Sequence, residues 1–337
     1  MTAVAIASGY QGPPELTVAR AFTSWTLDVP VLAAVLLAGA VYLAGVRRVR
    51  RTGGGWPTGA VAAFCGGGLG VLVIATMSFL GVYQGVLFYV RAVQTVLLLL
   101  AAPLFLALGR PLSLVIASWP RTGRRVEALV ASRPARVLTF PAITALAVVL
   151  VGFVLYFTPW YEAGLRNDLV RELTYLALLA PGWVFFWTLL RVDPVPRAYP
   201  YLVALWVTGV EVVADAVLGL AIMADQNLIA GAYYRALARP WGPSLRADQV
   251  IGGGALWLLG DLIGLPFLAA MLIQMVREDD REARVVDAEL DAADAMPGAA
   301  GAGPAAAGAG PGPAGTAQPW WENDPRFTGR FRRPGGA

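Results

Sequence analysis

The chain contains no histidine and no lysine, so all 26 of its basic residues are arginine. Without imidazole, this chain alone cannot build a histidine-ligated haem, copper or zinc site. Without lysine it cannot form a retinal Schiff base, which excludes a seven-helix rhodopsin. The single cysteine, Cys65, excludes a disulfide framework and a Cys-x-x-Cys metal carrier. The missing histidines also exclude Ser–His and Cys–His catalysis, and we expect a protein that is not an enzyme.

Charged residues are scarce as well, and apolar residues take their place. Charged side chains make up 14% of the 337 residues and apolar ones 57%, with a mean hydropathy of +0.62. A soluble domain carries about a quarter charged residues. The apolar residues form long blocks rather than short core runs, which is typical of membrane spans. Residues 1–28 do not open with the basic region of a signal peptide, and we expect them to form an extracytoplasmic segment.

Several apolar blocks are long enough to cross a bilayer, which takes about 20 residues at a rise of 1.5 Å each. They lie at 29–46, 59–80, 84–109, 138–158, 172–190, 200–224 and 251–276. The sequence therefore predicts an all-α, polytopic membrane protein. We expect residues 29–276 to form a bundle of about seven transmembrane helices.

Arginines concentrate in two of the loops between these blocks. The loops at 46–58 and 110–137 hold most of the loop arginines, with Glu127 as their one acid. Such loops remain in the cytoplasm, so we expect the N-terminus outside and the C-terminus inside. The loop at 225–250 is the exception, because arginines outnumber acids there on the expected outer side. This topology accounts for the pI near 9.4 without a nucleic-acid partner.

The sequence changes character after the last apolar block. Residues 277–291 are rich in charge and are expected to form a helical extension in the cytoplasm. Residues 292–337 are rich in Ala, Gly and Pro, a composition that buries too little surface to fold, and we expect a disordered tail. At 320–333 aromatic residues alternate with arginines, which suits either a solvated tail or a contact with anionic lipid or a partner.

Four ionisable residues lie inside the predicted spans: Arg91, Glu211, Asp215 and Asp261. A charge in hydrocarbon costs several kcal/mol unless it is paired or hydrated, so each is a candidate functional residue. Counted from the predicted outer ends, three of them lie roughly 10 to 15 Å deep, and Glu211 lies one turn deeper than Asp215. They can form an ion pair that fixes helix packing, an ion or metal pathway, or a pocket for a lipid head group.

Methionines and glycines in the spans allow further interpretations. Thioethers are ligands for Cu(I), although scattered methionines in apolar spans usually serve packing. The methionines concerned are Met77, Met223, Met271 and Met275. Two triplets, at 66–68 and 252–254, consist of glycine and permit close helix approach. Neither is a phosphate-binding loop, since neither follows a strand or precedes Gly-Lys-Ser/Thr.

A series of motifs along the chain resembles one known family. The motifs are Trp25–Asp28, Gly45–Arg51, Thr76–Tyr83, Ala102–Pro111, Tyr156–Pro159, Phe185–Trp187, Val192–Arg197, Arg239–Leu245, Asp248-Gln249, Gly252–Gly254, Trp257, Gly260 and Asp261. Over roughly residues 20 to 290 the chain resembles the CtaG family of caa3-type cytochrome c oxidase assembly factors, in its actinobacterial form. The resemblance implies a seven-span bacterial cell-membrane protein that assists assembly of a haem-copper oxidase, with copper supplied on the outer face through histidine ligands.

The chain departs from this family where the resemblance implies histidines. Those positions are Gly85, Arg91, Thr95, Arg171, Tyr175, Ala177 and Asp215. A guanidinium and a carboxylate, Arg91 and Asp215, stand where two imidazoles are expected, and we predict that they form a neutral pair without metal. The resulting hypothesis is a divergent member without a cofactor, in which the fold is kept and the copper site is lost.

Three functions follow as hypotheses. The first is an accessory factor for oxidase assembly, acting through contacts with oxidase subunits or an assembly chaperone in the lipid bilayer. The second is a transporter or proton pathway that uses Arg91, Glu211, Asp215 and Asp261, for which water-filled access is the expected sign. The third is a scaffold whose tail recruits cytoplasmic partners.

Overall fold

The computed structural model describes residues 9–197 and 199–294, and all regular structure within these ranges is helical. The predicted tail at 292–337 therefore lies almost wholly outside the described residues. The chain divides into two units, Met1–Asp279 and Asp280–Ala337, and the described part of the second continues the last helix to Asp294. The helices are α1 (Val18–Thr23), α2 (Val29–Arg51), α3 (Thr58–Val61), η1 (Ala62–Leu69), α4 (Gly70–Met77), α5 (Phe79–Tyr83), α6 (Phe88–Val96), η2 (Leu97–Ala101), α7 (Ala102–Leu108), α8 (Pro111–Ser118), α9 (Pro120–Val130), α10 (Arg133–Leu138), α11 (Pro141–Phe157), α12 (Trp160–Arg166), α13 (Asp168–Leu190), α14 (Tyr201–Ala224), α15 (Gly231–Ala236) and α16 (Leu245–Asp294).

Six helices or helix runs in the described residues are long and apolar enough to cross a membrane. A seventh forms if α11 and α12, which meet at a bend of 68°, count as one span. The predicted all-α membrane fold is thus confirmed. Several boundaries differ from the sequence prediction by a few residues, and two matter most here: the third span continues to Ser118 rather than 109, and the last begins at Leu245 rather than 251.

The third span continues because its break at Arg110 is stabilised from another part of the chain. Arg110 adopts a left-handed conformation with φ of 54°, and Pro111 then opens α8. The Asp193 carboxylate accepts hydrogen bonds from the backbone N–H groups of Leu112 and Ser113, at 3.0 and 2.8 Å. These are donors that a helix start leaves unpaired, and a carboxylate also suits the positive end of the helix dipole.

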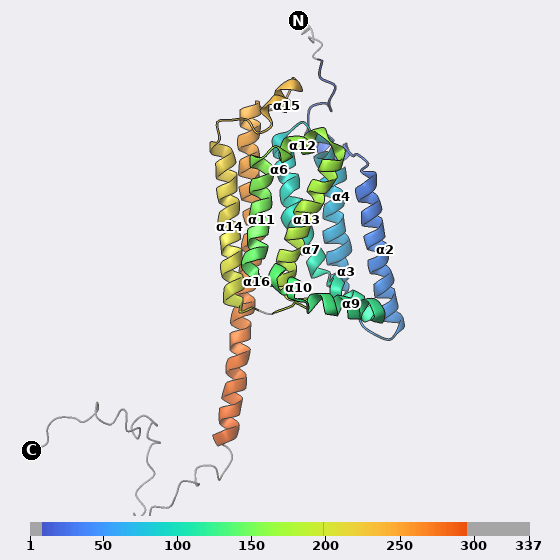
Figure 1. Ribbon diagram of the computed structural model, residues 1–337, viewed down its shortest axis with the longest axis vertical. Helices are drawn as coiled ribbons and strands as arrows, with labels where there is room; N and C mark the ends of the chain where they lie inside the picture. The colour runs from blue at the N-terminus through green and yellow to red at the C-terminus, as the bar shows by residue number, and fades with distance from the viewer. Residues whose placement is uncertain (1–8, 198, 295–337) are drawn as a thin grey trace, which may run out of the picture. The chain divides into compact units, whose positions relative to one another are not determined.

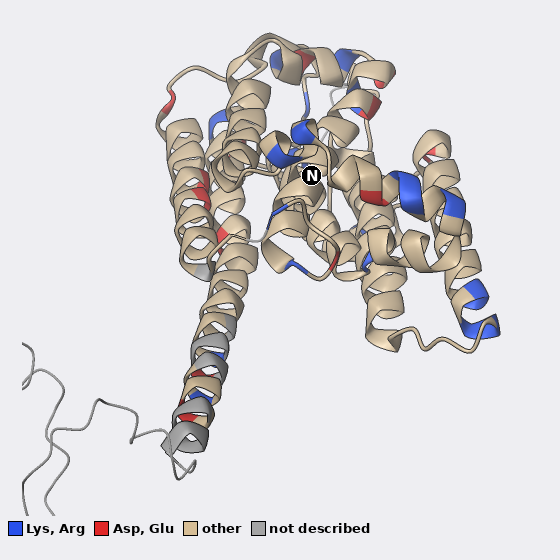
Figure 2. Cartoon of the chain, turned by 60° about the horizontal axis from the view of Figure 1, so that its bottom comes forward, with Lys and Arg blue, Asp and Glu red and all other residues tan. Residues whose placement is uncertain are grey.

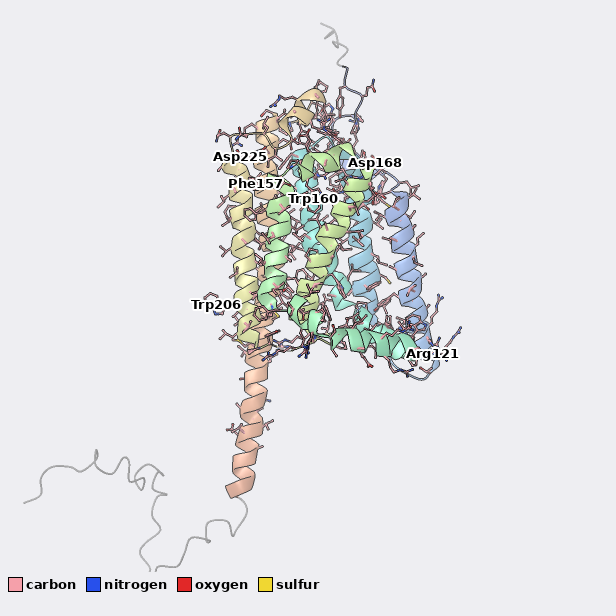
Figure 3. All side chains as sticks on the ribbon, viewed as in Figure 1. Arg121, Phe157, Trp160, Asp168, Trp206 and Asp225 are labelled. Carbon is pink, nitrogen blue, oxygen red and sulfur yellow. The ribbon has the colours of Figure 1, made fainter. Side chains whose placement is uncertain are left out.

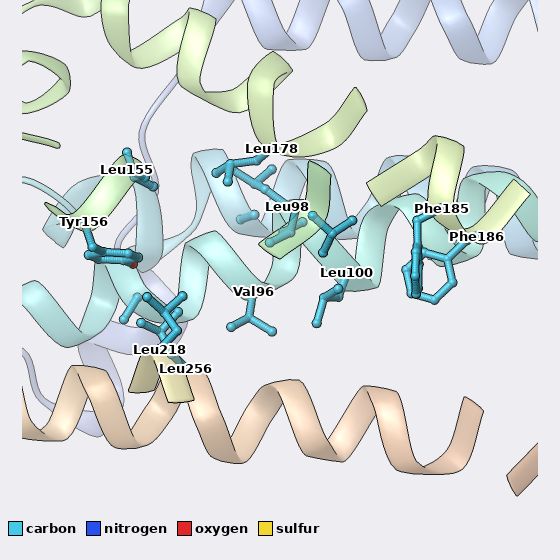
Figure 4. Packing of buried hydrophobic residues seen from close by; sticks show 14 of the residues in the cluster. Val96, Leu98, Leu100, Leu155, Tyr156, Leu178, Phe185, Phe186, Leu218 and Leu256 are labelled. Atoms are coloured by element: carbon cyan, nitrogen blue, oxygen red, sulfur yellow. The ribbon is translucent and has the colours of Figure 1, made fainter. Parts of the chain in front are cut away.

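The third span, α6–η2–α7–α8, forms the centre of the bundle. In its most apolar stretch 72% of residues are buried, against 17% for α2. Figure 4 shows Val96, Leu98 and Leu100 of this span beside Leu178 of α13, with Leu218 and Leu256 of the last two spans close by. Figure 1 shows α2 at the opposite edge of the bundle from α14 and α16.

Both glycine triplets allow the close approach that the sequence predicts. A side chain at Gly67 or Gly68 would collide with Phe105 or Leu106 of α7. A side chain at Gly253 would collide with the backbone oxygen of Gly219 on α14, and one at Gly252 with Phe88. The first and last members of the triplets, Gly66 and Gly254, face open space. Close helix contact therefore depends on two glycines of each triplet.

The two ends of the bundle differ in charge. Figure 3 shows Trp160, Asp168 and Asp225 at one end, called here the α12 end, and Arg121 and Trp206 at the other, the α9 end. In Figure 2 the α9 end comes forward, and basic residues lie on its helices. The arginines near this end are Arg47, Arg48, Arg50, Arg51, Arg110, Arg121, Arg124, Arg125, Arg133, Arg136, Arg191 and Arg197.

Candidate functional site

The four predicted intramembrane charges lie in two separate places. Arg91 is three residues from the start of α6, whereas Asp261 is sixteen residues from the start of α16. Both helices start at the α12 end, so Arg91 lies about 5 Å from its helix start and Asp261 about 24 Å from its own, at 1.5 Å per residue. The acids are therefore deeper in the bundle than the arginine. Asp215 lies nine residues from the end of α14, about 14 Å, as the sequence predicts. The predictions for Arg91 and Asp261 are wrong, because α6 begins at Phe88 rather than at 84 and α16 begins at Leu245 rather than at 251.

The Arg91 guanidinium is buried against aromatic groups instead of acids. The residue is 4% exposed, and its Cζ lies 4.9 Å from the centre of the Tyr161 ring. Gly164 of α12 makes room for it, since a Cβ there would lie 2.7 Å from Nη2. No ion pair among the described residues joins Arg91 to an acid, so the predicted Arg91–Asp215 pair is wrong. A cation over a tyrosine face gains roughly 2 kcal/mol when both are desolvated.

Tyrosines surround Arg91, and together they form what we call the Arg91 cluster: Arg91, Thr95, Tyr156, Tyr161 and Tyr234. The hydroxyls of Tyr161 and Tyr234 lie 2.8 Å apart, and Tyr156 donates a hydrogen bond of 3.1 Å to Thr95 Oγ1. Burial raises the pKa of Tyr234 above its usual 10.0, so its hydroxyl stays neutral. The Nη1 atom of Arg91 has no hydrogen-bond partner among the described residues. The cluster thus stabilises a cation with ring faces and neutral hydroxyls.

A second polar network lies beside the cluster and joins α6, α13 and the end of α5. Tyr175 donates a hydrogen bond of 2.9 Å to Gln84 Oε1. Gln94 Nε2 donates to the Ala75 carbonyl at 2.8 Å and approaches the Tyr175 hydroxyl at 3.5 Å. All three side chains are buried, and their hydrogen bonds offset the cost of burying polar groups.

The loop above the Arg91 cluster is fixed by the Asp248-Gln249 motif at the start of α16. Asp248 accepts a hydrogen bond from the Tyr89 N–H at 3.0 Å and forms an ion pair of 3.2 Å with Arg239, whose side chain is 3% exposed. Gln249 accepts from the Ile229 N–H and donates to the Asn227 carbonyl. These contacts hold the segment that carries Tyr234, so the motif positions one side of the cluster.

The seven positions where histidines are expected fall into two groups. Arg91, Thr95 and Tyr175 belong to the two networks, and a Cβ at Gly85 would lie 3.5 Å from the Tyr233 hydroxyl. The others lie elsewhere. Arg171 forms ion pairs with Asp168 at 2.6 Å and Glu172 at 3.5 Å, Ala177 is half-buried on α13, and Asp215 is on α14.

The three acids meet where α14 packs on α16. Glu211 is 2% exposed, and its Oε1 and Asp261 Oδ1 are buried without hydrogen-bond partners among the described residues. Two glycines of α16 admit the carboxyl groups: a Cβ at Gly260 would lie 2.6 Å from Asp215 Oδ2, and one at Gly264 would lie 3.8 Å from Glu211 Oε2. The site combines close helix packing with carboxyl groups that face one another.

The residues present do not fit a bound copper ion. Cu(I) prefers thiolate, thioether and imidazole ligands, whereas the first group of positions offers a guanidinium, two hydroxyls and a glycine. In the ranges that the structure describes, no three His, Cys, Asp or Glu side chains are arranged to hold a metal. Met223 packs against Gly253 of α16, and Met271 lies in the core eighteen residues further along that helix, about 27 Å away, so these two thioethers cannot share an ion.

Sequence reasoning missed the tyrosines that contact Arg91. Tyr161 lies on α12, in a stretch expected to be a loop, and Tyr234 lies on α15, in another. Tyr156 stood inside a motif that carried the family resemblance, and Gln94 follows Arg91 by one helical turn. The face shared by Arg91, Gln94 and Thr95 was the available signal that α6 buries a polar surface.

Comparison with known proteins identifies related sequences. Residues 40–278 match the model of the family described as cytochrome c oxidase caa3 assembly factor (Caa3_CtaG). Uncharacterized proteins of Mycobacterium bovis and Mycobacterium tuberculosis are each 30% identical over 291 residues, and one of Mycobacterium leprae is 29% identical. These alignments cover 84% of this chain and 44% of each relative, so the chain spans less than half the length of those proteins. No solved structure shows a significant match.

Proposed function

Because the chain belongs to the family of caa3-type cytochrome c oxidase assembly factors, we propose that it assists assembly of a haem-copper oxidase without itself binding copper. In this proposal the chain is not an enzyme. It acts in the bacterial cell membrane through contacts with oxidase subunits or with another assembly protein. The relatives are longer, so the proposed activity concerns this chain and not the whole of those proteins.

The Arg91 cluster is the observation that carries the copper-free part of the proposal. A buried, permanently charged guanidinium repels a metal cation from the positions where the resemblance implies ligands. Tyr161 and Gly164 fit closely around it, and the Tyr234 hydroxyl is already bonded to that of Tyr161. These contacts favour a closed, structural cluster over a site that accepts and releases an ion.

The proposal includes an orientation with the α9 end in the cytoplasm. Arginines at that end greatly outnumber the acids Glu127 and Asp193, whereas acids and arginines are nearly balanced at the α12 end. Such an excess of arginine is typical of cytoplasmic loops. Labelling of single cysteines tests this in a Cys65→Ala background. A membrane-impermeant reagent applied to whole cells should label a cysteine at Asp168 and should not label one at Arg121.

Gene deletion in the source bacterium tests the proposed function. We expect the deletion to lower the oxidase haem absorbance and the oxygen uptake with reduced cytochrome c, and the wild-type chain to restore both. Excess copper in the medium should not replace the chain, because the chain does not supply copper. Arg91→Gln should weaken the restoration, whereas Arg136→Gln, an exposed change at the α9 end, should retain it. Unchanged oxidase in the deletion strain would contradict the proposal.

A second candidate, passage of protons or cations, is supported by the two unpartnered carboxylate oxygens of Glu211 and Asp261. Buried carboxyl groups inside membrane spans often mark such pathways. Purified chain in liposomes with a pH-sensitive dye inside tests it. A flux above that of empty liposomes that Glu211→Gln abolishes would support this candidate. A flux equal to that of empty liposomes would eliminate it.

A further inference from the structure

A large apolar cavity lies between α2 and α13, and we call it the α2–α13 cavity. Its volume is about 540 Å³, within the range of sites that hold a small ligand. It is lined by Pro30, Val31, Ala34, Val35, Ala38, Phe64, Leu69, Leu72, Thr76, Leu98, Leu106, Pro111, Glu172, Tyr175, Leu176, Leu179 and Trp183. Its wall is apolar apart from a few groups, and the charged one, Glu172, lies at the α12 end.

The length of this cavity corresponds to one leaflet of a bilayer. On α13 it is lined from Glu172 to Trp183, eleven residues along the helix. At 1.5 Å per residue this is about 16 Å, and the hydrocarbon core of a bilayer is about 30 Å thick. An extended acyl chain that enters near Glu172 would therefore end near the middle of the membrane.

A second cavity of about 520 Å³, whose lining has a larger share of polar groups, adjoins this apolar one and forms its mouth. The two share Pro30, Thr76 and Glu172 as lining residues. The charged residues of the mouth are Asp28, Asp168, Arg171 and Glu172, so carboxyl groups outnumber the single guanidinium. A ligand that spans both cavities would have a long apolar tail and a polar head.

The mouth offers complementary groups to both charges of a zwitterion. Asp28 caps α2 and Glu172 lies on α13, and their carboxyl groups lie side by side in the mouth. Two adjacent carboxyl groups favour a cation between them. The partly exposed guanidinium of Arg171 also lines the mouth, where it pairs with Asp168 and Glu172. A guanidinium suits a phosphate oxygen.

We propose that the two cavities together bind one phospholipid with a phosphoethanolamine head. One acyl chain occupies the α2–α13 cavity. The primary ammonium lies against Asp28 and Glu172, and the phosphate lies against the exposed part of the Arg171 guanidinium. Anionic heads fit less well, because the mouth carries more negative than positive groups. This site does not depend on the proposed role in oxidase assembly.

Two other hollows on the bundle serve as internal comparisons. One, of about 680 Å³, lies between α14 and α16, and another, of about 670 Å³, lies on the other side of α2. Both are apolar and neither is lined by a charged residue. Such hollows are typical lipid-facing surfaces with no means of selecting a head group. The polar mouth distinguishes the α2–α13 cavity from them.

Lipid competition in nanodiscs tests the proposal on the full-length chain. The chain is reconstituted in phosphatidylcholine with equal small amounts of phosphatidylethanolamine and phosphatidylglycerol, then released into mild detergent and analysed by native mass spectrometry. We expect one phosphatidylethanolamine retained per chain, in preference to phosphatidylglycerol. Glu172→Gln should reduce that preference about tenfold, the effect of losing one charged hydrogen bond.

Matched variants on α2 test the tail site. Ala34→Phe fills the cavity and should abolish retention, whereas Ala33→Phe, at an exposed position that does not line it, should leave retention unchanged. Thermal unfolding of both variants checks that they are folded. Equal retention of the two lipids by the wild type, or retention that survives in folded Ala34→Phe, would overturn the proposal. A quinone retained from native membranes in place of phospholipid would also overturn it.

Discussion

Arg91 and Glu211 are buried in the same bundle, with Asp215 and Asp261 half-buried near Glu211, but the cation and the acids are accommodated in opposite ways. Arg91 lies near the α12 end, where α12 and α15 supply tyrosine rings and hydroxyls. The acids lie deeper, where glycines of α16 leave space for the carboxyl groups of α14. Arginine retains its charge in proteins, whereas a carboxyl group can become neutral by taking up a proton. A buried arginine therefore needs surrounding groups that stabilise a positive charge, whereas carboxyl groups can lie next to one another once they are protonated.

The largest expected effect comes from exchanging the two charges. Arg91→Asp should cost about 3–5 kcal/mol, because it leaves an unpaired buried charge and removes the contact with Tyr161. Asp215→Arg should cost about 3 kcal/mol for another reason: the aspartate already fills the space at Gly260, where a Cβ would lie 2.6 Å from Oδ2, and a longer side chain must push α14 and α16 apart. The double variant should lose as much unfolding free energy as the two single variants together, since the residues form no ion pair. Denaturant unfolding in detergent measures this. Recovery of more than about 1 kcal/mol in the double variant would show that Arg91 and Asp215 interact.

Neutral replacements should cost less stability than the charge exchange, and they should cost more at Arg91 than at Glu211. Arg91→Gln loses the cation–π contact with Tyr161 and leaves a buried amide unsatisfied, at a cost of about 2–3 kcal/mol. Glu211→Gln keeps the shape of the side chain between the same helices and should cost less than about 1 kcal/mol. The same unfolding measurement compares them. Equal losses would indicate that Glu211 has a charged partner comparable in importance to Tyr161.

The burial of Tyr234 gives the Arg91 cluster a dependence on alkaline pH. Burial raises the pKa of Tyr234 above 10.0, so the unfolded chain releases this proton at lower pH than the folded chain does. The associated stability is present below pH 10 and is lost as pH rises through the folded pKa. Tyr234→Phe should cost about 1 kcal/mol at pH 8 and reduce the loss of stability above pH 10. Thermal unfolding from pH 8 to 11 checks this, with Tyr199→Phe as the control.

The smallest effect is expected for the ion pair between Arg166 and Glu162 on α12. Its atoms are 2.7 Å apart, but the side chains are 55% and 34% exposed. Such pairs contribute about 0.5 kcal/mol or less, so Glu162→Gln should leave the unfolding midpoint nearly unchanged. A loss above about 1 kcal/mol would indicate that α12 is held at this point rather than by Arg91.

Hydropathy predicted the spans well but not the partners of the buried charges. Apolar runs locate a span because a helix needs about 20 consecutive apolar residues to cross a bilayer. They do not reveal that Pro111 continues a span after a break, since that depends on Asp193 from a distant loop. They also do not reveal that α12 turns back at 68°, which brings Tyr161 to Arg91.

The candidate site could be predicted only in part for the same reason. Arg91, Glu211, Asp215 and Asp261 stand out because charges are rare in apolar runs. The cluster tyrosines do not, because a tyrosine near a span end is usual. The depth estimates placed Arg91 and Asp261 too close in depth, because α6 starts four residues after its apolar block begins and α16 starts six residues before its own.

A Cu(I) titration of the purified chain under reducing conditions, against a competing chelator, tests the central claim most directly. We predict no stoichiometric tight copper, because Arg91, Thr95 and Tyr175 occupy positions where the resemblance implies histidine ligands. One tightly bound copper per chain, lost on replacing Tyr175 or Thr95 but retained in an Arg136→Gln control, would contradict the account.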